Sequence, residues 1–533
     1  MPERGSTTRI QRLVHDALVL SSSRAPDKAS VIADGVHHSY RELWDSARRL
    51  AGALQTHGVQ PGDRVLLWLE NGWAAAVSIY AVWIAGGVLA VINPQTRPDK
   101  FLFIAKDSQA TALIGEAKLV EPLSGVLGTV DSSLRYTAVS GESVHFESIE
   151  ALFEDVAAPL IEPRPVIATD LAALIYTSGS TGEPKGVMHN HQSMVFASTS
   201  IIEYLRLSED DRVLCVLPLA FDYGLYQLLM SVQLGATLIL EKSFAFAGQV
   251  LARLEKERAT VFPGVPTLFA SLIDGYRRNG KTFPFVQRVT NTAAALPEGF
   301  IAGLQKVFPE SLVFSMYGLT ECKRATWLDP EQLEKRPGSV GKAIPGTDAF
   351  VLRDDGTRAP PGETGILHVR GPHVMLGYWR RPEQTARMLR PGNWPGERML
   401  CTQDLFCSDE HGYLYFVGRS DDVIKSRGEK VSPVEVERVL CGLEGVHQAA
   451  VLGMDDPILG QAICAFVEPD GTSEITPAHL KAGCSEKLEP FMVPRHFEII
   501  EQLPRTANGK VDKRHLSAEF AQITGEGAAL RKV

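Results

Sequence analysis

The order of apolar and polar residues along the first 420 positions alternates between two patterns. Residues 40–54 (YRELWDSARRLAGAL) repeat apolar side chains at helical spacing, and Ser39 can cap a helix that begins there. The same spacing predicts a first helix from Ile10 to Leu18. Between such segments lie short apolar runs that are typical of strands buried on both faces, such as RVLLWL, LAALIYTS, DRVLCVLPL, ATLILE and TVFPGVP. Helices alternating with buried strands predict a mixed α/β fold with layered sheets and helices.

The pattern changes twice towards the carboxyl terminus. After Ala343, short alternating runs separated by Asp-Gly and Pro-Gly turns predict an antiparallel β region. After about residue 420, VEVERVLCGL and AHLKAGCSEKL are typical of helices, whereas HQAAVLGM and AICAFVEP are typical of strands. We therefore expect a large multi-subdomain N-terminal domain at residues 1–420 and a small, mobile α+β domain at residues 421–533.

One uncharged stretch, residues 71–95, is long enough to span a bilayer. Two adjacent glycines, Gly86 and Gly87, interrupt it, and its character changes there from small residues to the β-branched run VLAVINP. A buried helix, a glycine turn and a buried strand explain this stretch better than a membrane span does.

Length, charge and cysteine content narrow the class of protein. The chain has 533 residues, with 54 Lys and Arg against 63 Asp and Glu, and a net charge of −9. No block of basic residues offers the clustered cations that bind a phosphate backbone, so nucleic acid is not an expected partner. The seven cysteines form no CxxC pair, and charged residues interrupt the apolar positions at the amino terminus. We expect a cytoplasmic protein.

The segment with the clearest chemistry is YTSGSTGEPKG at residues 176–186, which follows the buried run LAALI. Its glycines permit a backbone in which successive N–H groups converge, its hydroxyls add hydrogen-bond donors, and Lys185 adds a positive charge. These properties suit the phosphates of a nucleotide. The segment does not fit the GxxxxGK[ST] pattern of P-loop proteins.

This string resembles the signature loop of the adenylate-forming superfamily, which includes acyl-CoA and aryl-CoA ligases, amino-acid adenylation domains and luciferases. Four further motifs of that superfamily follow in the expected order. They are YGLTE at 317–321, TQDLF at 402–406 where the family usually has TGD, GRSDDVIKSRG at 418–428, and PRTANGK at 504–510. Together the five motifs cover almost the whole chain.

The resemblance implies a reaction in two steps, with ATP and Mg²⁺ required. A carboxylate attacks the α-phosphate of ATP to give an acyl-adenylate and pyrophosphate, and a thiol then displaces AMP to give a thioester. Attack of one anion on another requires cations and preorganised donors rather than a covalent nucleophile. The resemblance assigns the catalytic roles to Lys510, Thr320, Glu321 and Lys185, with Glu321 as the Mg²⁺ ligand.

The same resemblance implies the nucleotide contacts. The loop residues and Lys185 would hold the β- and γ-phosphates, Thr320 the α-phosphate, and Asp404 both ribose hydroxyls, assisted by Arg419. Tyr317 would lie on the adenine, and the segment NTAAALP would line it. The expected nucleotide-binding residues are Thr177, Ser178, Ser180, Thr181, Thr292, Ala293, Ala294, Tyr317, Gly318, Asp404 and Arg419.

The small domain carries two functional positions in this interpretation. Lys510 would bridge the carboxylate and the α-phosphate during adenylation. Asp421 matches the hinge at which the small domain rotates between the two steps, because hinges are a few residues that absorb dihedral change.

The acid is expected to bind against Phe221, Asp222, Tyr223, Gly264 and Val265. In adenylation enzymes for amino acids, an Asp after Phe binds the substrate ammonium, so Asp222 could hold an amino or imino acid such as proline. Alternatively, Asp222 is hydrogen-bonded within the wall of an aryl- or acyl-CoA ligase. The nearby His189 and His191 are interpreted as hydrogen-bonding or packing residues, because no acidic or Cys ligands accompany them.

The acceptor thiol is left open between CoA and the phosphopantetheine of a separate carrier protein, with CoA favoured. The oligomeric state, monomer or homodimer, is also open. A non-catalytic nucleotide-binding relative is the remaining alternative of a different class. The intact Glu321, Asp404, Arg419 and Lys510 argue against it.

Overall fold

The computed structural model describes most of the chain. The described residues are 11–130, 133–178, 184–244, 247–292, 298–419, 424–426, 429–456, 460–506, 510–513, 515–518 and 520. The predicted hinge residue Asp421 and the loop residues Ser180 and Thr181 lie outside them, as do Ala293 and Ala294, and the side chain of Ser178 is not described either.

A mixed sheet of fourteen strands runs through much of the described chain, in the order β17-β18-β21-β22-β16-β15-β14-β13-β12-β10-β11-β1-β2, with β20 paired to β21. Its first part, from β17 to β22, is antiparallel, as the alternating runs after Ala343 predict. Its strands are β1 (Ala29–Ala33), β2 (Val36–Ser39), β10 (Arg212–Cys215), β11 (Thr237–Leu240), β12 (Val261–Gly264), β13 (Arg288–Asn291), β14 (Leu312–Tyr317), β15 (Thr326–Leu328), β16 (Ser339–Ala343), β17 (Asp348–Leu352), β18 (Gly365–Arg370), β20 (Leu389–Pro391), β21 (Arg398–Ser408) and β22 (Leu414–Arg419).

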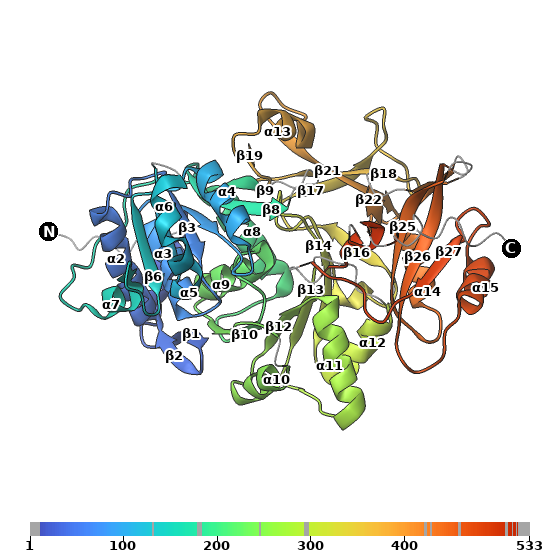
Figure 1. Ribbon diagram of the computed structural model, residues 1–533, viewed down its shortest axis with the longest axis horizontal. Helices are drawn as coiled ribbons and strands as arrows, with labels where there is room; N and C mark the ends of the chain where they lie inside the picture. The colour runs from blue at the N-terminus through green and yellow to red at the C-terminus, as the bar shows by residue number, and fades with distance from the viewer. Residues whose placement is uncertain are drawn as a thin grey trace, which may run out of the picture.

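A second sheet has eight strands in the order β19-β9-β8-β4-β3-β5-β6-β7. It lies in the blue to cyan half of the molecule, with helices packed over it (Figure 1). Its strands are β3 (Arg64–Trp68), β4 (Val88–Val91), β5 (Ala112–Glu116), β6 (Tyr136–Ser140), β7 (Glu147–Ser148), β8 (Leu171–Ser178), β9 (Pro184–Asn190) and β19 (Gly377–Tyr378).

The third sheet belongs to the carboxyl-terminal region, at the opposite end of the molecule from the second sheet (Figure 1). It contains β23 (Ile424–Ser426), β24 (Glu429–Val431), β25 (Val446–Asp456), β26 (Gly460–Pro469) and β27 (His496–Ile499), and helices α14 (Pro433–Cys441) and α15 (Pro477–Lys487) accompany it. These elements match the helices and strands predicted there, so the predicted fold class is confirmed. The domain boundary at residue 421 stays a prediction.

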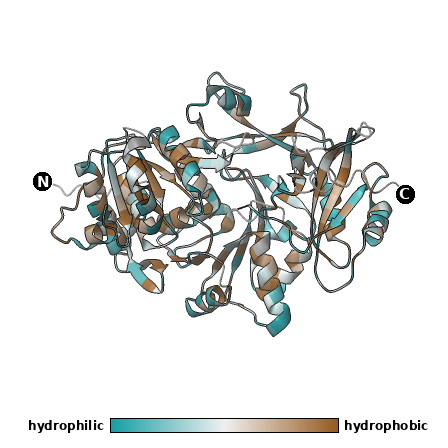
Figure 2. Ribbon diagram, viewed as in Figure 1, coloured by the Kyte–Doolittle hydropathy of each residue, from teal (hydrophilic) through white to brown (hydrophobic). Residues whose placement is uncertain are grey.

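The remaining helices cover the two larger sheets. Figure 2 shows mostly hydrophilic residues on peripheral helices such as α13 and α15. The helices are α1 (Asp16–Arg24), α2 (Tyr40–Thr56), α3 (Trp73–Ile84), α4 (Pro98–Ser108), α5 (Ala117–Val120), η1 (Glu121–Leu123), α6 (Ser124–Val130), α7 (Ile149–Glu154), α8 (His191–Leu205), α9 (Asp222–Leu234), α10 (Ala247–Lys256), α11 (Pro266–Asn279), α12 (Glu298–Val307), η2 (Pro330–Gln332) and α13 (Pro382–Met388).

Two helix predictions can be compared with the structure. Ser39 caps α2 through a capping box, accepting from the Glu42 amide (3.1 Å) while its own amide donates to the Glu42 carboxylate (2.6 Å). The first helix was expected from Ile10, and this was wrong in its start, because α1 begins at Asp16. The Asp16 carboxylate accepts from the Arg12 and Leu13 amides, and these bonds hold the preceding residues in a turn.

The uncharged stretch at residues 71–95 folds as predicted. It forms the buried helix α3, a turn in which Gly86 has φ +81°, and the buried strand β4. Within the described residues, no helix is long and apolar enough to cross a membrane.

Candidate active site

Strands β8 and β9 carry the two ends of the predicted phosphate loop. They pair antiparallel, and Thr177 on β8 lies opposite Lys185 on β9. Both side chains are half-buried. The loop between these strands includes Ser180 and Thr181, which lie outside the described residues. The structure therefore gives the position of the loop's base, formed by Thr177 and Lys185.

Glu321 is held by a residue that the sequence motifs did not indicate. The Tyr378 hydroxyl donates to Oε1 of Glu321 (2.6 Å), and the Lys185 ammonium lies 5.6 Å from the centre of the Tyr378 ring. Burial, with the charge of Glu321, raises the pKa of Tyr378, so this hydroxyl keeps its proton. Tyr378 is 57 residues from Glu321, and no local signal in the sequence joins them. The segment that leads into β19 meets the loop that carries Glu321, since the Met375 amide donates to the Glu321 carbonyl (2.7 Å).

The YGLTE motif forms the loop between β14 and β15. The Ala325 amide donates to the Tyr317 carbonyl (2.9 Å) and closes this loop. A Cβ on Gly318 would lie 2.3 Å from the Lys323 carbonyl oxygen, so only glycine fits there. Thr320 and Glu321 are half-buried, whereas the following residues, Cys322 to Ala325, are buried in the protein. The loop thus turns one part towards solvent and the next part into the core.

The predicted ribose contacts lie on β21 and β22. Asp404 and Arg419 are register partners on these strands, and Nε of Arg419 lies 3.6 Å from Oδ1 of Asp404. The Tyr317 hydroxyl donates to Oδ2 of Asp404 (2.5 Å). The Tyr317 ring packs edge-on against Phe406, with centroids 4.8 Å apart. The structure therefore brings together the predicted adenine-stacking residue and the predicted ribose ligand.

The departure from the TGD motif has a structural counterpart. Gln403, at the position of the family glycine, adopts a left-handed backbone with φ +61°. This conformation favours glycine, and other residues adopt it at a cost of roughly 1–2 kcal/mol. The loop therefore keeps its conformation without its glycine, and the neighbouring Asp404 is buried.

Lys510 lies on a short turn in which the Thr506 amide donates to the Lys510 carbonyl (2.7 Å). Its side chain is exposed to solvent, yet the protein atoms and charges around it shift its pKa. Crowding by protein atoms lowers the pKa of Lys510, the positive charge of Arg419 lowers it further, and the negative charge of Asp404 raises it. The charges of Arg419 and Asp404, the pair that forms the predicted ribose contact, therefore act on Lys510.

The predicted acid-binding residues come from two helix starts. Phe221 precedes α9, Asp222 is its first residue, and the Tyr223 hydroxyl lies 2.6 Å from the Thr290 carbonyl of β13, to which it donates. Gly264 ends β12, and a Cβ there would lie 2.5 Å from the Phe269 ring. Val265 precedes α11. The carboxyl ends of β12 and β13 therefore meet the start of α9, which is where ligands bind in open α/β sheets.

The acid-binding side contains buried charges of both signs. Oδ2 of Asp222 is out of contact with solvent and has no hydrogen-bond partner among the described residues. Burial raises the pKa of Asp222, and the positive charges of Lys323 and Arg324 oppose that rise. Burial likewise lowers the pKa of Lys323, which the charge of Asp222 opposes. The guanidinium carbon of Arg324 lies 4.7 Å from the centre of the Tyr223 ring. A substrate bound here would lie beside the interacting charges of Asp222, Lys323 and Arg324.

Both histidines after the phosphate loop make the hydrogen bonds expected of them. Nε2 of His189 lies 2.9 Å from the Thr320 carbonyl, and Nδ1 of His191 accepts from the Val14 amide (3.3 Å). Burial lowers the pKa of His191 to about 4. In the described part of the chain, no group of three or more His, Cys, Asp or Glu side chains is arranged to hold a metal ion.

The site nevertheless suits Mg²⁺, since this ion usually binds through one or two carboxylates and the phosphates of a substrate, and keeps several waters. Glu321 is a half-buried carboxylate whose orientation Tyr378 fixes, at the base of the predicted phosphate loop. Glu321 would be the protein ligand, and bound Mg²⁺ supplies positive charge that offsets the phosphate oxygens.

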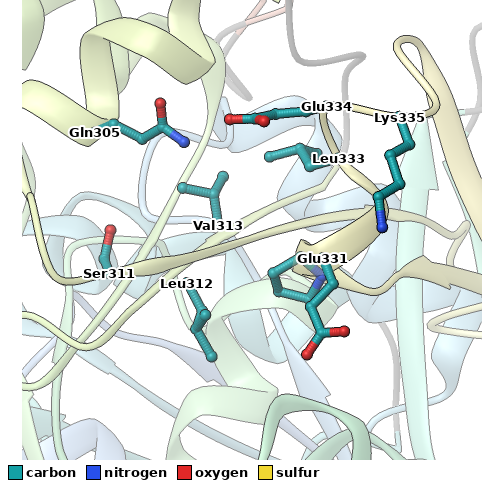
Figure 3. Close-up of a pocket in the computed structure, with 9 residues that line it drawn as sticks. Gln305, Ser311, Leu312, Val313, Glu331, Leu333, Glu334 and Lys335 are labelled. Carbon is teal, nitrogen blue, oxygen red and sulfur yellow. The ribbon is translucent and has the colours of Figure 1, made fainter.

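A separate pocket lies away from these residues. It has a volume of about 270 Å³, and Gln305 of α12 faces Glu334 across it (Figure 3). Charged side chains of Glu331, Glu334 and Lys335 surround it. None of the predicted site residues lines this pocket.

Comparison with known proteins decides the family. Residues 20–379 match the model of the AMP-binding enzyme family, and residues 435–510 match the AMP-binding enzyme C-terminal domain. This chain belongs to the AMP-binding enzyme family. The match to the C-terminal domain ends at Lys510.

Three relatives of this AMP-binding enzyme cover nearly its whole length. A long-chain-fatty-acid–CoA ligase from Bacillus subtilis is 30% identical, over 95% of this chain and 94% of its own. A feruloyl-CoA synthase from an Amycolatopsis species is 31% identical, over 93% and 96%. The solved structure of o-succinylbenzoate coenzyme A synthetase from B. subtilis, in complex with ATP and a magnesium ion, has a TM-score of 0.81, 27% identity and coverage of 94% and 98%. The predicted reaction class, an AMP-forming acid–thiol ligase, and the predicted use of ATP and Mg²⁺ are confirmed.

Proposed function

We propose that this enzyme activates a small-molecule carboxylic acid with ATP and transfers the acyl group to CoA. The observation that carries the proposal is the arrangement of Asp404 and Arg419, which pair on adjacent strands of one sheet. Asp404 also accepts from Tyr317, and the charge of Lys510 from the carboxyl-terminal region acts near that pair. Lys510 supplies the cation that is proposed to act on the α-phosphate. The two CoA ligases that align with nearly the whole chain support CoA as the acceptor.

In this proposal each residue acts through charge or through a hydrogen bond. Asp404 accepts from the ribose hydroxyls, Lys185 and Thr177 hold the terminal phosphates, and Thr320 contacts the α-phosphate. Lys510 then offsets the charge that builds up as the acid carboxylate attacks phosphorus. Pyrophosphate leaves, and the acyl-adenylate remains for attack by the thiol.

The thioester step is proposed to follow rotation of the small domain about Asp421. The hypothesis predicts that Asp421→Pro spares pyrophosphate exchange and impairs thioester formation, because proline restricts the backbone dihedral angle that the rotation must change. Equal loss of both half-reactions would contradict this assignment. The cytoplasmic location, like the oligomeric state, stays a prediction.

Acid-dependent exchange between ATP and pyrophosphate is the test of the proposed activity. A panel of aryl, fatty and amino acids would be assayed first, and mass spectrometry would then identify products formed with CoA or with a carrier protein. Exchange with at least one acid and formation of its CoA thioester are expected. Exchange followed by transfer only to a carrier protein would overturn CoA as the acceptor.

A second candidate is an enzyme that loads an amino or imino acid onto a carrier protein. Oδ2 of Asp222 favours it, because a buried carboxylate oxygen without a hydrogen-bond partner among the described residues could receive a substrate ammonium. Asp222→Asn would then abolish exchange with amino acids. If aryl or fatty acids support exchange and the variant retains it, this candidate is excluded.

A further inference from the structure

The loop that carries Thr320 and Glu321 is anchored from inside the protein by Lys323. This side chain is 1% exposed. Its ammonium group lies 2.7 Å from Nδ1 of His189 and donates to Oγ of Ser193 (3.1 Å) and to the carbonyl of His373 (3.0 Å). These partners belong to β9, to the first turn of α8 and to the segment before β19. One side chain therefore joins three separate segments to the loop.

His189 extends this anchor to Thr320. Its Nε2 lies 2.9 Å from the Thr320 carbonyl, which can only accept, so Nε2 is the nitrogen that bears hydrogen. Nδ1 then has a free lone pair and accepts from the Lys323 ammonium. The order of donation is Lys323 to His189 to the Thr320 carbonyl, and it fixes the tautomer of the ring.

The anchored segments are the ones that carry the predicted phosphate-side residues. His189 is four residues after Lys185 on the same strand, β9. The segment that begins at His373 also donates from the Met375 amide to the Glu321 carbonyl (2.7 Å), and it continues into Tyr378, which bonds the Glu321 carboxylate. Lys323 thus lies where the supports of Lys185, Thr320 and Glu321 meet.

Packing alone is a poor explanation for a lysine at this position. A buried ammonium loses its hydration, and Lys323 also has a left-handed backbone with φ +63°, which side-chain-bearing residues adopt reluctantly. An apolar residue would fill the space without the first of these costs. The hydrogen bonds to β9, α8 and the segment before β19 are what only a long cation provides here.

We propose that Lys323 is a positioning residue for adenylation, which sets Thr320 and Glu321 against strand β9 through His189. The proposal rests on the proposed contacts of Thr320 and Glu321 with ATP and Mg²⁺. It concerns geometry: the ammonium touches neither nucleotide nor acid, and acts through the His189 ring and the backbone of the loop.

Lys323→Met tests this, because methionine is an unbranched side chain that keeps most of the length of lysine and loses its hydrogen bonds. We expect kcat of pyrophosphate exchange to fall by about 10- to 100-fold, the range in which small misplacements of reacting groups act. The KM for the acid is not the diagnostic quantity, because the charge of Lys323 also opposes the rise in the pKa of Asp222. MgATP binding, measured by calorimetry without acid, should weaken.

Two further variants separate positioning from stability. The double variant His189→Leu with Lys323→Met removes the buried Nδ1 that Lys323→Met leaves without a donor, but it leaves the Thr320 carbonyl without one, so the melting temperature should fall no further than in the single variant while kcat stays low. Tyr40→Phe removes a buried hydroxyl that donates to the Ser231 and Ala236 carbonyls in another part of the protein. It should lower the melting temperature and leave kcat and MgATP binding unchanged.

The proposal is overturned if Lys323→Met keeps the wild-type kcat and MgATP affinity, or if the double variant regains kcat together with its melting temperature. Failure of the proposed function looks different. If the wild-type protein binds MgATP but none of the tested acids supports pyrophosphate exchange, the proposed function is contradicted. The calorimetric comparison would still decide the role of Lys323.

Discussion

The two halves of the proposed site differ in how their polar groups are satisfied. On the nucleotide side, Glu321 bonds Tyr378, and Asp404 bonds Tyr317 and pairs with Arg419. On the acid side, three buried polar atoms have no hydrogen-bond partner within the described residues: Oδ2 of Asp222, the Tyr226 hydroxyl and Nε of Arg324. The predicted nucleotide side has one such atom as well, Oγ1 of Thr292, so within the described residues the two halves differ in the number of these atoms.

This difference matches what the two halves have to bind. Every reaction cycle uses the same nucleotide, so its ligands can be fixed by side chains such as Tyr378. An unpaired buried polar atom costs about 1–3 kcal/mol, and a substrate with complementary groups would recover that cost. Under the proposed function, a group of the acid that bonds Oδ2 of Asp222 would recover such a cost.

The largest effect is expected from the removal of Lys510, whose ammonium would contact both the acid carboxylate and the α-phosphate. Lys510→Ala should lower pyrophosphate exchange by roughly 100-fold or more, because a charge-assisted contact made in the transition state is lost. Binding of ATP should change much less. Exchange near the wild-type rate would show that the small domain, as oriented here, is not the adenylating arrangement.

A smaller loss is expected on the nucleotide side alone. Tyr378→Phe removes the hydroxyl that orients Glu321, and a hydrogen bond to a charged group is worth about 1.5–3 kcal/mol, so exchange should fall by roughly tenfold or more. Half-saturation by Mg²⁺ should shift to higher concentration, and the KM for the acid should stay the same. If the Mg²⁺ concentration for half-saturation does not change, the hypothesis that Tyr378 orients Glu321 as the Mg²⁺ ligand is contradicted.

A pair of matched variants compares satisfied and unsatisfied hydroxyls on the acid side. Tyr223→Phe loses the hydrogen bond to Thr290 and should lower the free energy of unfolding by about 1 kcal/mol. Tyr226→Phe removes a buried hydroxyl without a partner in the described chain, and should be neutral or stabilising in urea denaturation. Equal destabilisation by both changes would mean that the Tyr226 hydroxyl is bonded in the folded protein.

The stability of the protein should also depend on pH through His191, which lies where β9 ends and α8 begins. The folded pKa of His191, about 4, is below the unfolded value of about 6.5. Folding therefore favours the neutral ring, so its stabilising effect is complete above about pH 6.5 and is lost as pH falls towards 4. Between pH 7 and 5.5, His191 should account for about 1 kcal/mol of the loss in unfolding free energy. His191→Gln should flatten the profile by that amount, and an unchanged profile would place the titration elsewhere.

The smallest effect concerns the backbone next to Asp404. Gln403→Gly should relieve the left-handed strain of roughly 1–2 kcal/mol, less about 0.5–1 kcal/mol for the added freedom of glycine in the unfolded chain. A net gain of about 0.5 kcal/mol in unfolding free energy, and no change in the KM for ATP, are expected. A loss of stability would indicate that the Gln403 side chain makes a contact that outweighs its backbone strain.

Sequence reasoning succeeded for the family and for local elements, because the patterns that indicate them lie in contiguous segments; the roles of the site residues stay predictions. The hydroxyls and glycines around Lys185, and the carboxylates Glu321 and Asp404, sit in motifs whose residues suit a nucleotide without reference to the rest of the chain. The helical pattern of residues 40–54 and the glycine turn at Gly86 were readable for the same reason.

It failed where distant segments meet. Tyr378 reaches Glu321, and Lys323 reaches His189, only because β19, β9 and the loop after β14 come together. No period or local motif encodes such a meeting. The start of α1 was misplaced because apolar spacing alone does not reveal that the Asp16 carboxylate holds the preceding turn.

The fourteen-stranded sheet has a consequence for redesign of this enzyme. Gly264, Tyr317, Asp404 and Arg419 all lie on its strands, so the predicted acid wall and the predicted ribose contact are parts of one hydrogen-bonded sheet. In the proposed function, the sheet then fixes the distance between the acid and the nucleotide. Lys510 comes from outside that sheet. The proposed roles therefore predict that exchanging the carboxyl-terminal segment with that of a relative changes the rate of each half-reaction, while the choice of acid stays with the recipient.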